Sequence, residues 1–100
     1  NLTGTISNLD TFPSLSTFDC SSNNIANFIG GVGSTLVNFN ASNNSLNQTT
    51  VDLILEKFDE EGASNGTLNL DGGTNASPTN GTSNLNYTSL IGKGWAITVN

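Results

Sequence analysis

Two segments of the chain, 21 residues apart, carry the same pattern of apolar and polar positions. They read Leu15-x-x-Phe18-x-Cys20-x-x-Asn23-x-Ile25 and Leu36-x-x-Phe39-x-Ala41-x-x-Asn44-x-Leu46. In each segment two apolar residues alternate with polar ones before the asparagine. Such alternation predicts a short strand that buries one of its faces.

The same register extends towards the C-terminus at a wider spacing. Leu68 follows Phe39 by 29 residues, and Ile97 follows Leu68 by 29. We therefore expect four short strands, near residues 17–20, 38–41, 67–70 and 95–99. Their inward side chains would be Phe18, Cys20, Phe39, Ala41, Leu68, Leu70, Trp95, Ile97 and Val99.

Helical spacing accounts for the wider interval. A helix is predicted over residues 50–61, whose apolar residues recur at i, i+3, i+4 and i+7: Val51, Ile54, Leu55 and Phe58. Thr49 or Thr50 is its expected N-cap, and Gly62 its expected C-terminal stop. A shorter helix is expected near 84–91, with the apolar residues Leu85, Leu90 and Ile91.

The eleven-residue pattern resembles that of the leucine-rich repeat superfamily, L-x-x-L-x-L-x-x-N-x-L, most clearly over residues 1–46. Within residues 1–6, Leu2, Gly4 and Ile6 resemble the last positions of a plant-type repeat, L-x-G-x-I. The C-terminal half, with its Gly94-Trp95-x-Ile97-x-Val99 segment, resembles the ending of bacterial and phage-encoded surface proteins of this superfamily. The resemblance implies an α/β solenoid, with a short parallel sheet on its concave face and turns and two short helices on its convex side.

The repeat boundaries divide one domain of residues 1–100. We expect a partial first repeat at 1–14, a repeat at 15–35, a repeat at 36–64 with the helix 50–61, an irregular repeat at 65–93 with the helix 84–91, and a terminal strand at 94–100. The partial first repeat lacks its own strand, which suggests the C-terminal portion of a longer array or a subunit whose first strand comes from elsewhere.

An asparagine ladder is the structural feature that the resemblance implies. Asn23 and Asn44 would hydrogen-bond turn backbone inside the stack. In the next repeat Gly73 stands where the ladder asparagine belongs, and Asn75 stands where the last leucine belongs. We therefore expect the ladder to lapse after Asn44.

The concave face of the strands is the usual binding surface of the superfamily. Here its outward positions are polar and almost uncharged: Thr17, Asp19, Asn38, Asn40, Thr67, Asn69 and Asp71. Two interpretations stand side by side. This surface binds a glycan or a peptide, or its polarity only keeps the open face of a sheet soluble.

Composition excludes several classes of function. The formal net charge is −6, and only Lys57 and Lys93 are basic, so no nucleic-acid partner is expected. Histidine is absent, which removes histidine-based triads and common zinc sites, and no facing pair of carboxylates across a cleft is indicated. Asp71, Asn69 and Asn75 match no known calcium loop. We expect no enzyme activity, no cofactor, no metal and no membrane insertion.

Asparagine, serine and threonine dominate the chain, with 17 Asn and 25 Ser plus Thr. Such a surface is common in extracellular and virion-surface repeat proteins, so we expect an extracellular, cell-surface or virion-surface location. Possible N-glycosylation sequons begin at Asn1, Asn40, Asn43, Asn47, Asn65, Asn75, Asn80 and Asn86. Cys20, the single cysteine, is expected to be a small buried apolar residue.

Two functions remain as hypotheses. The first is a non-enzymatic structural or adhesion module that assembles with itself head to tail, through its solenoid ends, into a filament or appendage. The alternative is a ligand-recognition module of a cell-surface or phage tail protein, which binds a glycan or protein through the concave face.

Overall fold

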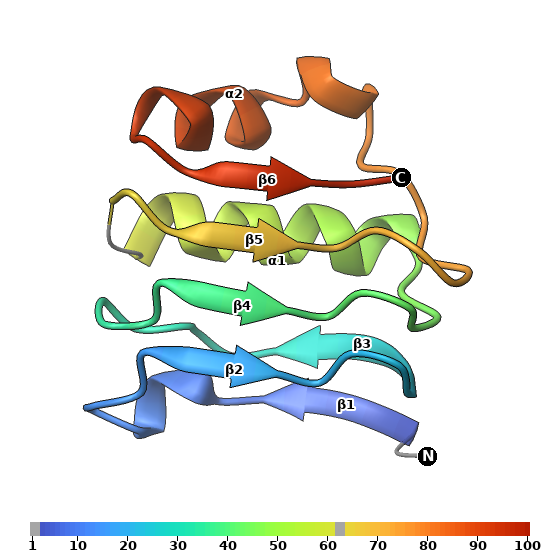
Figure 1. The fold of residues 1–100 in the computed structure, drawn as a ribbon, viewed down its shortest axis with the longest axis horizontal. Coiled ribbons are helices and arrows are strands. Elements are labelled where there is room, and N and C mark those ends of the chain that lie inside the picture. Colours follow the sequence, from blue (N-terminus) through green and yellow to red (C-terminus); the bar gives the residue numbers. More distant parts are fainter. Residues whose placement is uncertain (1–2, 62–63) are drawn as a thin grey trace.

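The computed structural model describes residues 3–61 and 64–100 of the chain (Figure 1). Within those residues the fold is mixed α/β, with two parallel sheets and two α-helices. In chain order the elements are β1 (Thr3–Ser7), the 3-10 helix η1 (Leu9–Thr11), β2 (Thr17–Asp19), β3 (Asn24–Ile29), β4 (Asn38–Asn40), α1 (Gln48–Glu61), β5 (Thr67–Asn69), the 3-10 helix η2 (Gly81–Ser83), α2 (Leu85–Gly92) and β6 (Ala96–Thr98).

The four-stranded sheet confirms the expected strands and their register. Its order is β2-β4-β5-β6, and every neighbouring pair is parallel. Phe18 is level with Phe39, Phe39 with Leu68, and Leu68 with Ile97. The inward residues of the two middle strands are fully buried, whereas Phe18 and Ile97 at the sheet edges are half-buried.

A second sheet lies where the sequence predicted only turns. β1 pairs in parallel with β3, and the register shifts between Gly4 and Thr5. The expected parallel sheet and two helices are present, and the β1-β3 sheet adds a pairing that the sequence did not predict. β3 was missed because its buried residues, Ile25 and Phe28, are three positions apart and break the two-residue alternation of a regular strand.

Helix α1 begins earlier than predicted, at Gln48. Asn47 is its cap, because the backbone N–H of Thr50 donates to Oδ1 of Asn47 at 2.9 Å. The prediction of Thr49 or Thr50 as the cap is therefore wrong, and the Thr50 hydroxyl donates instead to the carbonyl of Ala26. The predicted stop, Gly62, lies outside the described residues. The four apolar residues of the helical pattern are all buried, as expected.

Helix α2 lies beyond β6, at the opposite end of the molecule from β1 (Figure 1). Asn84 caps it, because Oδ1 of Asn84 accepts the backbone N–H groups of Asn86 and Tyr87. Of its three apolar residues only Leu90 is buried, whereas Leu85 is 85% exposed and Ile91 46% exposed. The predicted boundaries 84–91 are thus one residue from those observed at each end.

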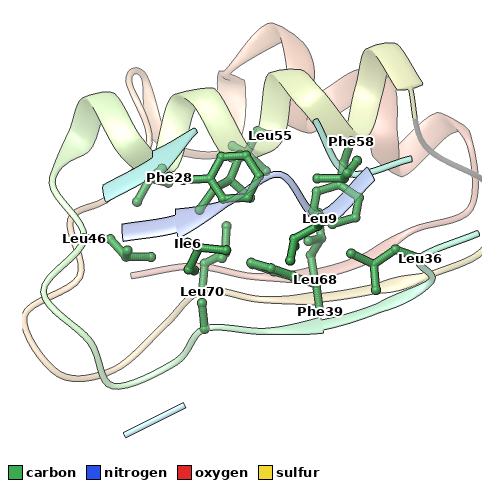
Figure 2. Packing of buried hydrophobic residues seen from close by; sticks show 14 of the residues in the cluster. Ile6, Leu9, Phe28, Leu36, Phe39, Leu46, Leu55, Phe58, Leu68 and Leu70 are labelled. Atoms are coloured by element: carbon green, nitrogen blue, oxygen red, sulfur yellow. The ribbon is translucent and has the colours of Figure 1, made fainter. Parts of the chain in front are cut away.

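The core joins both sheets to α1 (Figure 2). Phe39 lies at its centre, with its ring centroid 5.8 Å from that of Phe18, 6.3 Å from that of Phe28 and 5.3 Å from that of Phe58. Phe58 in turn meets Trp95 at 5.2 Å. Burial of each such side chain contributes about 1.5–3 kcal/mol, so these rings hold elements from both ends of the chain together.

Candidate functional site

Six polar side chains from three adjacent strands form what we call the open sheet face: Thr17, Asp19, Asn38, Asn40, Thr67 and Asn69. They point away from the core because they alternate with the inward residues of β2, β4 and β5. The parallel register places Thr17, Asn38 and Thr67 in one row and Asp19, Asn40 and Asn69 in another. The structure therefore brings together six of the seven residues predicted for this surface.

The open sheet face is hollowed, and its six side chains line a cavity of about 160 Å³. Asp71, the seventh predicted residue, follows β5 and is not among the lining residues. Thr17, Asn38 and Thr67 form the first row of this cavity and make no side-chain hydrogen bond within the described part of the chain. These three side chains are thus available to an incoming polar group.

Two side chains of the second row are held by serines two residues further along the chain. Oδ1 of Asp19 accepts the backbone N–H of Ser21 at 2.9 Å and the Ser21 hydroxyl at 2.7 Å. Oδ1 of Asn40 accepts the same two groups of Ser42 at 3.0 and 2.7 Å. We call this pair of hydrogen bonds the serine bracket. In the first of these brackets the backbone N–H, followed by the hydroxyl, lowers the pKa of Asp19 below its usual value.

The third side chain of that row, Asn69, has no serine bracket. The residue two positions further on is Asp71, which has no hydroxyl, and its backbone N–H does not donate to Asn69 either. Oδ1 of Asn69 is buried and has no hydrogen-bond partner in the part of the chain that the structure describes. An unpaired buried carbonyl oxygen of this kind lowers the free energy of unfolding by about 1–3 kcal/mol. Most buried polar atoms have a hydrogen-bond partner, so Asn69 is an exception.

The asparagine ladder supports the sheet from within. Nδ2 of Asn44 donates to the carbonyl of Cys20 at 3.0 Å and to that of Ala41 at 3.1 Å, while its Oδ1 accepts the N–H of Ile25 at 3.0 Å. Asn23 donates likewise to the carbonyl of Cys20 at 3.0 Å. The roles predicted for Asn23 and Asn44 match these contacts.

The prediction that the ladder lapses after Asn44 is wrong, because Asn75 continues it. Nδ2 of Asn75 donates to the carbonyls of Ala41 and Leu70 at 3.0 and 3.1 Å, and its Oδ1 accepts the N–H of Leu46 at 2.9 Å. Asn75 stands five residues after its strand residue Leu70, whereas Asn44 stands three after Ala41. Gly72 and Gly73, with φ of 77° and 58°, take the chain through the two extra residues in left-handed conformations.

The sequon asparagines lie in different environments. Asn75 is buried, and its Nδ2, the atom that would carry a glycan, is enclosed by carbonyl groups of the ladder. Asn40 is half-buried in its serine bracket. Asn43, Asn65 and Asn80 are exposed in left-handed turns, Asn47 caps α1, Asn86 lies in the first turn of α2, and Asn1 lies outside the described residues. Asn47 is exposed as well, so the exposed sequons among the described residues are those at Asn43, Asn47, Asn65 and Asn80.

Cys20 and two aspartates of α1 are buried or hydrogen-bonded within the fold. Burial, followed by the charge of Asp19, raises the pKa of the Cys20 thiol to about 11, and the side chain is buried as predicted. On α1, Asp52 accepts the N–H of Thr79 at 2.8 Å, and Asp59 pairs with Lys93 at 2.8 Å. These carboxylates tie the following loop and α2 to α1.

No group of three or more His, Cys, Asp or Glu residues is placed to hold a metal ion within residues 3–61 and 64–100. Over the same residues, neither helix has the length and apolar character that crossing a membrane requires. The open sheet face can donate and accept hydrogen bonds, and that is its chemical capacity. No family model, no curated protein and no solved structure matches this chain.

Proposed function

We propose that the chain is a leucine-rich repeat solenoid segment that serves as a non-enzymatic adhesion or recognition module. The repeated ladder supports the architecture, because Asn44 and Asn75 make equivalent hydrogen bonds to the preceding turn although 31 residues separate them. The in-register parallel sheet supports it too. Stacked turns of this kind give a rigid surface on which side chains keep fixed positions.

The open sheet face is the surface proposed to bind. The observation that carries this proposal is a hollow that crosses three strands. The side chains of Thr17, Asn38 and Thr67, which line it, make no hydrogen bond within the described residues. Two of the three neighbouring polar side chains on the same strands, Asp19 and Asn40, are held by serine brackets. Because free donors and acceptors on rigid strands lose little entropy on binding, this row is suited to recognition of a polar ligand.

Chemical-shift mapping tests this function. The ¹⁵N-labelled chain would be titrated with neutral oligosaccharides, charged oligosaccharides and short polar peptides. The expected shifts centre on the amides of Thr17, Asn38 and Thr67, and the double variant Asn38→Ala, Thr67→Ala should abolish them. The matched control is Thr82→Ala, Ser83→Ala, which removes two exposed side chains of η2. Binding that survives in the sheet variant, or shifts confined to α1 and α2, would contradict the proposal.

An extracellular or virion-surface location is part of the same proposal. It is supported by the low charged fraction of 10% and by the exposed sequons at Asn43, Asn65 and Asn80. Intact mass spectrometry of the chain secreted from a eukaryotic host tests glycosylation. Added hexose and N-acetylhexosamine at the exposed turns, with none at Asn75, is the expected pattern. Glycan on Asn75 would show that the ladder forms later than the modification.

End-to-end self-assembly is the second candidate, and a specific observation favours it. An apolar hollow of about 290 Å³ lies beside β1 and β2, lined by Ile6, Leu9, Phe12, Phe18, Cys20 and Ile25 among others. A strand added to the edge of β2 would cover it, and in a second copy half-buried Ile97 of β6 and Val99 just after it have the matching spacing. Sedimentation should then show concentration-dependent growth that the variant Phe12→Asp suppresses. Sedimentation that shows only monomers at high concentration would rule out end-to-end self-assembly.

A further inference from the structure

We propose that Asn69 is the ligand-binding residue of the open sheet face, and that the ligand is a neutral polyhydroxylated molecule such as a saccharide. This inference rests on the proposed recognition function and names its contact residue and ligand class. The serine bracket occurs on β2 and β4 but not on β5. Asp19 and Asn40 each accept two hydrogen bonds from a serine two residues later, whereas Asn69, at the equivalent place on β5, accepts none.

The missing bracket leaves the Asn69 side chain free to turn. Its carboxamide rotates about χ2, a torsion with a broad energy profile. For Asn40 the same rotation breaks two hydrogen bonds from Ser42. For Asn69 it breaks none to Oδ1, and it moves an unsatisfied buried oxygen towards the hollow that this residue lines. A ligand that donates to Oδ1 therefore relieves a cost that is already present in the free protein.

The charges around the hollow select a neutral ligand. Asp19 lines it, and Asp71 follows Asn69 by two residues. The two basic side chains of the chain lie elsewhere, with Lys93 paired to Asp59 and Lys57 beside Glu60 on α1. An anionic ligand would meet carboxylates and no cation, so sialylated, sulfated and phosphorylated ligands are disfavoured.

Size and hydrogen-bonding chemistry favour a sugar over an extended peptide. The hollow has a volume of about 160 Å³, close to the roughly 150 Å³ of a cavity that holds one six-membered ring, so it is on the scale of a single sugar ring. A carboxamide offers an acceptor and a donor side by side, and neighbouring sugar hydroxyls present the complementary pair. Thr67 and Asn38 supply further donors and acceptors in the adjacent row.

The substitution Asp71→Ser tests the inference without touching Asn69. It restores the serine found at Ser21 and Ser42, so the new hydroxyl should capture Oδ1 of Asn69. Neutral glycans identified on an array would be titrated by calorimetry into the wild type and three variants. We expect about tenfold weaker binding for Asn69→Ala and for Asp71→Ser, with a higher melting temperature for Asp71→Ser. The matched control, Asp71→Ala, removes the charge without adding a donor and should bind within about twofold of the wild type.

The outcomes separate this inference from the function on which it rests. If Asn38→Ala with Thr67→Ala abolishes binding while Asn69→Ala and Asp71→Ser leave it unchanged, the face binds ligand but Asn69 is not its contact, and the inference fails. Tighter binding of sialylated or sulfated glycans than of their neutral parents would also overturn it. So would binding that requires Ca²⁺ and disappears with a chelator, because a cation would then bridge the carboxylates. Binding of peptides alone would overturn the ligand class.

Discussion

The side chain of Asn75 holds the backbone of Leu46, whose N–H it accepts at 2.9 Å across 29 residues of sequence. The amide group of the same side chain donates to carbonyls of two successive turns. One carboxamide thus satisfies backbone groups that no strand or helix pairs. Because these groups are buried, the contact is a structural requirement of the irregular repeat.

Replacement of Asn75 by alanine should destabilise the fold by about 1–3 kcal/mol, because it leaves the N–H of Leu46 and the carbonyl of Leu70 without partners. For a chain of this size that corresponds to a fall in melting temperature of about 4–8 °C per kcal/mol. Thermal unfolding followed by circular dichroism measures it. Asn27→Ala, which alters an exposed residue of β3, is the control and should stay within about 0.5 kcal/mol of the wild type. Equal melting temperatures for the two variants would refute the role given to Asn75.

Gly66 is packed against the indole of Trp95. A Cβ at this position would overlap the Trp95 ring and approach the carbonyl oxygen of Val37. Gly66→Ala should therefore cost about 1–3 kcal/mol through overpacking and should shift the emission of this single tryptophan. Gly92→Ala is the matched control, because a Cβ there meets nothing within 4 Å. In the last turn of α2, alanine should be neutral or slightly stabilising. Similar losses at both glycines would show that packing against Trp95 is not the cause.

The Asp19 bracket gives the fold a dependence on acidic pH. The folded-state pKa of Asp19 is lowered by Ser21, so its contribution to stability is present above the ordinary pKa of about 3.9 and is lost as the pH falls through the folded value. Ser21→Ala should move the pKa of Asp19 part of the way back up, as measured by NMR titration of its carboxyl carbon. Ser42→Ala removes the equivalent hydroxyl beside neutral Asn40 and should leave the titration unchanged. An unmoved Asp19 titration in Ser21→Ala would count against the bracket.

The Cys20 thiol should be inert in the folded chain. Its pKa of about 11 lies above the ordinary thiol value, so the group remains protonated at about pH 8, and burial also blocks access. Protection from Ellman's reagent in buffer, with one equivalent of reaction in denaturant, is the expected result. The stabilisation that accompanies the protonated thiol is present below the unfolded-state pKa and is lost as the pH rises through about 11. Rapid reaction of the native protein would show that this part of the core opens.

The sequence predicts the strands that alternate and the helix that repeats every three to four residues. The predicted register of the four strands is confirmed at Phe18, Phe39, Leu68 and Ile97. Alternation within each strand is enough to show which of its side chains face the core. β3 was missed because Ile25 and Phe28, three residues apart, do not follow the two-residue alternation of a strand. A strand whose burial is set by a neighbouring strand carries no regular pattern of its own.

The site was predictable in composition but not in its decisive detail. The outward positions of β2, β4 and β5 follow from alternation alone. Asn69 differs from Asp19 and Asn40 in the residue two positions later, which is Asp71 instead of Ser21 or Ser42. That signal is present in the sequence, but its meaning requires the serine brackets to be seen. Asn75 was missed for a different reason, since the ladder was sought at a fixed spacing.

Gly72 and Gly73, which precede Asn75, allow this turn to hold two additional residues. Between Leu70 and Asn75 the chain has two residues more than between Ala41 and Asn44, and Gly72 and Gly73 absorb them in left-handed conformations. Asn75 thereby reaches the carbonyls of Ala41 and Leu70, as Asn44 reaches those of Cys20 and Ala41. The position of the asparagine in the interior is therefore set by its hydrogen bonds rather than by a fixed spacing along the chain. This turn lies against the preceding one, where Gly73 pairs with Asn44 and a Cβ on Gly73 would overlap the backbone of Asn43, so a side chain added here displaces the backbone beside it.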